Sequence, residues 1–236
     1  MSLYNEFFDQ NRDICAMELF EKWVLTQQTA HVIFLQEFNL KHISIELIES
    51  IQQKYCIQLP LIDDEIYSRT PDLTIALIRN DVSDSFIVKN SPGSWPKMIA
   101  LALERSNLDL LGLHRSLGKW RVLNEKTGKR EVTAQMDFKN SLFEYARTHD
   151  NSIMIGDWNA DRRTQENREF LEVIEKTHND LAVGTKWEDD KTFSSGLTRI
   201  DRAYLSKKAK IDFEFKHIDK TLDFTDHKAI LLNLSL

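Results

Sequence analysis

The stretch SIMIGDWNAD at residues 152–161 decides the fold of this chain. Three apolar residues run into Gly156, a pattern typical of a buried strand whose end opens a turn. Asp157 and Asn159 follow at the strand end, where sheets of this kind carry ligand sites. Residues two apart on an extended chain point the same way, so both side chains are predicted to reach one ligand while Trp158 packs on the other side. The alternative is a polar turn, because Asp and Asn also bond to nearby backbone.

The composition is that of a globular protein. The 236 residues are 42% hydrophobic and 29% charged, which supports a substantial core. No apolar run approaches the ~20 residues that span a bilayer, and the polar N-terminus does not resemble a signal peptide. Cys15 and Cys56 lack metal-ligand spacing and are predicted to be reduced, buried thiols. We therefore expect a cytoplasmic monomer with no membrane contact.

The net charge is −6, from 31 basic and 37 acidic residues. This balance argues against a protein that coats nucleic acid by bulk attraction. It leaves room for a nuclease with a local basic patch, because an acidic site for a divalent metal adds negative charge to the total.

Helices and strands alternate along the chain. Helical spacing of apolar residues is found at 12–28, 43–54, 132–149 and 164–177. Strands are expected at 1–5, 31–38, 72–79, 84–89, 97–104, 108–114, 152–157, 192–193, 200–205, 211–216 and 229–234. With seven glycines and four prolines there is no flexible linker, so residues 1–236 are predicted to form a single domain. The mixture of hairpin-like pairs and helices predicts an α+β fold in which helices cover mixed sheets.

Polar residues gather at the ends of these strands. Singly, each has a structural explanation, such as a solvated carboxylate, a half-buried histidine or a turn pair. Asp201 is the exception, because aspartate is disfavoured inside a strand and needs a partner when buried. The residues concerned are Glu37, His114, Asp157, Asn159, Asp201, Asp226 and His227.

The order of these residues resembles the endonuclease/exonuclease/phosphatase superfamily, the fold of deoxyribonuclease I and exonuclease III. The matching blocks span nearly the whole chain, and a Tyr-Asn pair at 4–5 fits the family's first strand weakly. They are LQE at 35–37, GLH at 112–114, GDWN at 156–159, RID at 199–201 and TDH at 225–227. The resemblance implies a four-layer α/β/β/α sandwich of two mixed β-sheets flanked by helices.

The resemblance also implies roles. Glu37 would be the principal ligand of Mg²⁺, or of Mn²⁺ in its place, because a carboxylate suits a hard cation. The other metal residues would be Asn5 and Asp226, and Phe7 stands where some relatives carry a further acidic residue, so a second metal is not expected.

The catalytic residues would be His114 as a donor to phosphate, Asp157 with Asn159 to orient water and phosphate, and His227 oriented by Asp201. Either His227 or Asp157 would take the proton from water.

The segment 115–130 carries the substrate prediction. It is basic and includes an aromatic residue, which can grip phosphates and stack a base. The residues expected to touch substrate are Arg115, Trp120 and Arg121. A solvated loop balanced by Glu125 and Glu131 is the structural alternative.

The sequence therefore predicts a nuclease that acts on DNA or RNA. The alternative is a Mg²⁺-dependent phosphatase of a nucleotide, an inositol phosphate or a lipid headgroup, which the acidic net charge favours. A non-catalytic binding module is the third reading, and the complete set of catalytic residue types argues against it.

Overall fold

The computed structural model describes residues 2–7, 14–26, 30–39, 43–62, 72–115, 122–124, 129–131, 134–193, 199–218, 225 and 227–235. For residues 2–7, 14–17, 122–124, 129–131 and 134–136 it describes the backbone alone. None of the helices in these ranges is long and apolar enough to cross a membrane.

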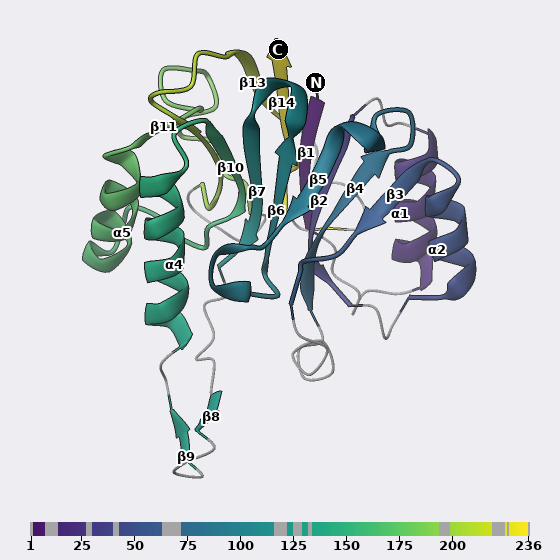
Figure 1. Cartoon of the computed structure of the whole chain (residues 1–236), viewed down its shortest axis with the longest axis horizontal. Helices are drawn as coiled ribbons and strands as arrows, with labels where there is room; N and C mark the ends of the chain where they lie inside the picture. Colours follow the sequence, from purple (N-terminus) through teal and green to yellow (C-terminus); the bar gives the residue numbers. More distant parts are fainter. Residues whose placement is uncertain are drawn as a thin grey trace.

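Two six-stranded sheets form the centre of the molecule (Figure 1). The first has the order β13-β14-β1-β2-β4-β3 and the second β11-β12-β10-β7-β6-β5. Both are mixed, because β1–β2 and β7–β10 are parallel pairs and the other pairs are antiparallel. The first sheet contains β1 (Ser2–Phe7), β2 (Val32–Phe38), β3 (Tyr55–Gln58), β4 (Leu73–Arg79), β13 (Asp212–His217) and β14 (Ile230–Ser235). The second contains β5 (Phe86–Lys89), β6 (Met98–Leu103), β7 (Leu108–His114), β10 (Ser152–Asp157), β11 (His178–Asp180) and β12 (Asp201–Ser206).

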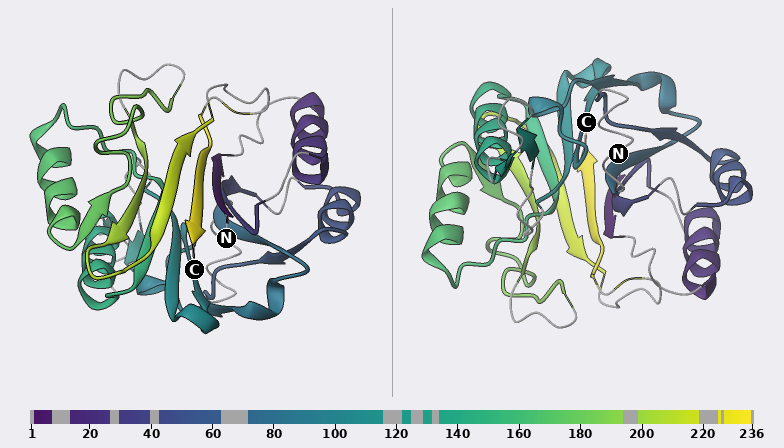
Figure 2. Two further views of the ribbon diagram at one scale, coloured as in Figure 1. Left: turned by 90° about the horizontal axis from the view of Figure 1, so that it is seen from above. Right: turned by 90° about the horizontal axis from the view of Figure 1, so that it is seen from below.

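Helices cover the two outer faces (Figure 2). α1 (Ile14–Thr26) and α2 (Ile45–Gln52) pack on the first sheet, and α4 (Ala134–Thr148) and α5 (Gln165–Glu175) pack on the second. α5 shows how the sequence specifies such a helix. The Thr164 hydroxyl accepts a hydrogen bond from the Asn167 N–H at 3.2 Å, and the apolar residues Phe170, Leu171 and Ile174 form one buried stripe. The predicted α+β sandwich with four layers is confirmed.

The inner faces of the two sheets meet in an apolar core. Val32, Phe34, Ala76 and Ile78 of the first sheet pack there with residues of the second sheet that include Ile99, Leu101, Leu110, Ile153 and Ile155. Gly112 of β7 allows the sheets to approach, because a Cβ at this position would lie 2.3 Å from the Phe34 ring. The glycine is thus required by close packing between the layers.

We expect Gly112→Ala to cost about 1–3 kcal/mol of unfolding free energy, the usual range for overpacking a core. Phe34→Leu in the same chain should recover part of that loss, since the smaller side chain removes the clashing ring. Urea unfolding of both single variants and the double variant measures the coupling. Strict additivity of the two effects would contradict the packing argument.

Several local predictions were wrong. The strands expected at 72–79 and 84–89 are present but lie in different sheets, and a turn and the 3₁₀ segment η1 (Ser83–Ser85) carry the chain from β4 to β5. The prediction missed β3, which follows α2 after only two residues, and β11, which is short and polar. The predicted loop at 115–130 contains a ribbon of β8 (Val122–Asn124) and β9 (Lys129–Glu131). Cys56 is reduced but half-buried, and the side chain of Cys15 lies outside the described part.

Candidate functional site

Three of the predicted residues lie in one row across the second sheet. His114 at the end of β7 is the parallel partner of Asp157 at the end of β10. Asp157 is in turn the antiparallel partner of Asp201 at the start of β12. Directly paired residues on neighbouring strands project to the same face. The strand pairing therefore brings together side chains that are far apart in the sequence.

Glu37 reaches this row from the first sheet. It lies near the end of β2, where the pairing with β4 is interrupted between Leu35 and Phe38. Its φ is +55°, an uncommon backbone conformation for a residue other than glycine, and such strain is concentrated at functional sites. The Glu37 carboxylate lies 3.5 Å from His114 Nε2, and Asp157 lies 3.7 Å from the same nitrogen. The two carboxylates thus face one space at the edge of the sandwich.

His227 and Asp201 form a buried pair. The Asp201 carboxylate lies 3.0 and 3.2 Å from His227 Nδ1. The backbone N–H groups of Ile200 and Asp201 both donate to the Thr192 hydroxyl at 3.0 Å, and the His227 N–H donates to the Thr225 hydroxyl at 3.1 Å. These contacts hold the imidazole against the Asp201 carboxylate.

Asp157 and Asn159 meet through a tight turn and not along an extended chain. Asn159 has a left-handed φ of +43°. Its backbone N–H donates to Oδ1 of Asp157 and its side-chain Nδ2 donates to Oδ2 of Asp157, both at 2.7 Å. Trp158 points away into the core against Phe170 and Tyr204, as predicted. The amide of Asn159 therefore holds the Asp157 carboxylate in one orientation.

The site carries two buried carboxylates next to one another. Burial raises the pKa of the Asp157 carboxyl well above its usual range, and the Asp201 carboxylate adds to that shift. His227 and the Asn159 N–H oppose it. One ligand atom from each of Asp157, Asp201 and His227 lies within 4.8 Å of the others. Oxygen ligands with excess negative charge suit a hard divalent cation, so the donor set fits a metal ion at this edge.

The other predicted site residues are placed less fully. Arg115 is buried, and its guanidinium donates to the Trp158 and Asn159 carbonyls and lies over the Phe170 ring. It braces the Asp157 turn, while its predicted contact with substrate stays a prediction. The backbone of Asn5 in β1 pairs with Phe34 of β2, and the side chain of Asn5 is outside the described part. Asp226, Trp120 and Arg121 also lie outside the described residues.

The sequence reasoning missed Lys97, which lies just before β6. Only 7% of it is exposed, and its ammonium lies 3.3 Å from His114 Nδ1 and 3.9 Å from the Glu37 carboxylate. The available signal was a lone lysine at the start of the apolar run MIALAL. A buried lysine is rare without a partner, so its position points to the site.

Asp180, Arg199 and Arg202 form a buried ion cluster next to Asp201. Asp180 of β11 accepts two hydrogen bonds from Arg199, at 2.7 and 2.8 Å, and one from Arg202, at 2.8 Å. Arg199 and Arg202 flank the Ile200-Asp201 pair, so the cluster fixes the backbone on both sides of the carboxylate. Such a network was not predicted, because its members are far apart in the sequence.

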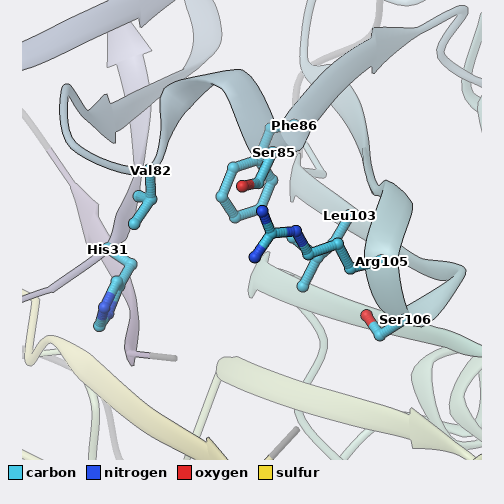
Figure 3. Close-up of a pocket in the computed structure, with 7 residues that line it drawn as sticks. All are labelled: His31, Val82, Ser85, Phe86, Leu103, Arg105 and Ser106. Atoms are coloured by element: carbon cyan, nitrogen blue, oxygen red, sulfur yellow. The ribbon is translucent and has the colours of Figure 1, made fainter.

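A pocket of about 440 Å³ lies elsewhere (Figure 3). Its lining includes His31, Phe86 and Arg105, and none of the predicted site residues whose side chains the structure describes. His31 directly precedes β2, whereas Glu37 lies near the other end of that strand. The pocket is therefore at the opposite edge of the sandwich from the candidate site.

No family model matches the chain, and no curated protein matches it either. Solved structures do match over the whole chain. A humanized TDP2 from D. rerio is 15% identical, with a TM-score of 0.65, and is covered over 99% of its length. An AP endonuclease from Archaeoglobus fulgidus is 12% identical with a TM-score of 0.64, and the 3′ phosphatase NExo from Neisseria, bound to a product DNA hairpin, is 10% identical with a TM-score of 0.67. Both are covered over their full length.

The chain shares the two-sheet sandwich fold of these solved structures. The fold implied by the sequence blocks is thereby confirmed. Identities of 10 to 15% establish the fold alone, and the chemistry depends on the residues at the site.

Proposed function

We propose that the protein is a divalent-metal-dependent phosphodiesterase that hydrolyses nucleic acid. One observation carries this proposal: carboxylates and imidazoles from both sheets meet at one edge of the sandwich. His114 Nε2 lies within 3.7 Å of both Glu37 and Asp157, and the Asp201–His227 pair adjoins Asp157. Phosphodiester hydrolysis needs carboxylates that bind a metal ion and imidazoles that transfer protons, and this cluster contains both.

Glu37 would be the main protein ligand of the metal, assisted by Asn5 and Asp226. A cation at this edge would also offset the repulsion between the buried carboxylates of Asp157 and Asp201. We propose Mg²⁺, with Mn²⁺ as a substitute, since both prefer oxygen ligands. A bound divalent ion supplies Lewis acidity and neutralises charge on the phosphate.

The chain's own residues would divide the proton chemistry. Asp201 accepts from His227 Nδ1–H, which leaves Nε2 of that histidine to accept a proton from the attacking water. Asp157, held by Asn159, would orient that water. His114 would donate from Nε2 to a phosphate oxygen, where negative charge builds in the transition state.

Two observations favour a polynucleotide over a small phosphoester. The basic segment at 115–130 follows His114 directly, and its β8–β9 ribbon projects beyond the body of the molecule (Figure 1). Such a ribbon could lie along a nucleic-acid backbone. In addition, the structural neighbour from Neisseria was solved with product DNA. The acidic net charge favours the alternative, a phosphatase of a small phosphorylated molecule.

A substrate panel separates the two functions. Single- and double-stranded DNA, RNA, nucleotides and inositol phosphates would each be incubated with the protein and Mg²⁺. We expect cleavage of a polynucleotide, with binding that weakens steeply as salt rises. Release of phosphate from the small esters alone would exclude the nuclease proposal and support the phosphatase.

Glu37→Gln tests the metal assignment. We expect Mg²⁺-dependent turnover to fall more than about 100-fold, because even outer partners of a metal ligand are worth 10–100-fold. Mn²⁺ affinity, measured by electron paramagnetic resonance, should fall in parallel while the melting temperature is retained. Glu172→Gln on the exposed face of α5 is the matched control and should keep normal turnover and normal Mn²⁺ affinity. Unchanged Mn²⁺ affinity in the Glu37 variant would remove this residue from the metal site.

A further inference from the structure

Lys97 contacts His114 through both its backbone and its side chain. The Lys97 carbonyl accepts a hydrogen bond from the His114 N–H at 2.9 Å. The Lys97 ammonium lies 3.3 Å from Nδ1 of the same histidine, and both side chains are buried. The lysine thus lies behind the imidazole, on the side opposite the nitrogen that faces the site.

The chemistry of the groups around His114 decides which nitrogen carries its proton. An ammonium group has donors and no lone pair, so the nitrogen that it contacts must accept. The Glu37 carboxylate lies 3.9 Å from the Lys97 ammonium, and this ion pair favours the charged form of the lysine. Nδ1 of His114 is therefore an acceptor.

The other ring nitrogen of His114, Nε2, faces carboxylates. Nε2 lies 3.5 Å from the Glu37 carboxylate and 3.7 Å from the Asp157 carboxylate. The closer of the two, the Glu37 carboxylate, accepts hydrogen bonds and so favours a proton on Nε2. Because Nδ1 accepts from the ammonium, the ring carries its one N–H on Nε2.

We infer that Lys97 is a positioning residue that fixes His114 in the tautomer with its proton on Nε2. His227 is held the other way, because its Nδ1 faces the carboxylate of Asp201 at 3.0 Å. The two histidines of the site thus carry their protons on different nitrogens. Under the proposed function, on which this step rests, His114 is a fixed donor to phosphate and His227 a fixed acceptor of a proton.

Nitrogen chemical shifts of ¹⁵N-labelled histidine test the tautomers directly. Long-range ¹H–¹⁵N spectra of the full chain at neutral pH in chelator should show His114 with protonated Nε2 and His227 with protonated Nδ1. This measurement needs no substrate and no metal. A protonated Nδ1 on His114 in the unaltered protein would overturn the inference.

Two substitutions test the part played by Lys97. Lys97→Met removes the donor while keeping an unbranched side chain, and we expect His114 to populate both tautomers. Lys97→Gln supplies a neutral N–H and should restore the Nε2 tautomer. If Lys97 acted only through its positive charge, glutamine would not restore that tautomer. His227 is the internal control, and its shifts should stay constant. An unchanged His114 tautomer in Lys97→Met would assign the tautomer to the carboxylates alone and overturn the role of the lysine.

Activity provides the second readout. Lys97→Met should lower kcat about 10-fold with little change in KM, a fraction of the effect of removing a transition-state donor outright. Lys97→Gln should recover most of that loss. If the nitrogen shifts agree with the prediction and no phosphoester is hydrolysed, the proposed function fails while the tautomer assignment stands.

Discussion

Replacing Asp201 with asparagine is expected to lower kcat for phosphodiester hydrolysis by about 10³- to 10⁴-fold, the scale of the same exchange in a Ser-His-Asp triad. The carboxylate accepts from His227 Nδ1 at 3.0 Å and so leaves Nε2 free of its proton. An asparagine amide can instead donate to Nδ1, which moves the histidine proton to Nε2 and removes the acceptor for the water proton. KM should change little, because Asp201 is buried behind the histidine.

Steady-state kinetics of Asp201→Asn and Asp212→Asn make the comparison. Asp212 is an exposed carboxylate at the start of β13, so its variant controls for the loss of one negative charge. The melting temperature of both variants should stay close to that of the unaltered protein. A kcat within threefold of normal in Asp201→Asn would contradict the role given to the Asp201–His227 pair.

Gly156→Ala should be the most destabilising single change in the strand that carries Asp157. A Cβ at this position would lie 1.8 Å from the Leu113 carbonyl oxygen of the neighbouring strand β7. Backbone cannot move aside as a flexible side chain can, so β7 and β10 must separate. We expect a loss of about 3 kcal/mol or more, at the upper end of overpacking effects. The activity should fall as well, because Asp157 and His114 are the next residues along the two strands.

Thermal unfolding measures this loss, which corresponds to roughly 6–12 °C in a chain of this length. Ile155→Val in the same strand is the control, and it should cost only about 0.5–1.5 kcal/mol while retaining activity. A normal melting temperature for Gly156→Ala would show that the two strands are not as close as described.

The sequence predicted the individual strand ends well, because the local pattern contains that information. An apolar run that stops at a glycine and continues with Asp-Trp-Asn marks a buried strand and a polar turn without knowledge of its neighbours. The order of the blocks then supplied the fold through resemblance.

The contacts between strands could not be predicted in the same way. Hydrophobic periodicity reports which face of a strand is buried, and it does not identify the strand beside it. The separation of β4 and β5 into different sheets and the row formed by His114, Asp157 and Asp201 both depend on strand order. Lys97 was missed for the same reason, since its partner lies 17 residues further along the chain.

The most direct test of the metal-dependent site is the cleavage rate of an end-labelled DNA in one reaction under three successive conditions. Mg²⁺ would be present first, excess chelator would follow, and Mg²⁺ would then be restored. The account predicts cleavage, its arrest in chelator and its full return with the metal. Cleavage that continues unchanged in excess chelator would contradict it.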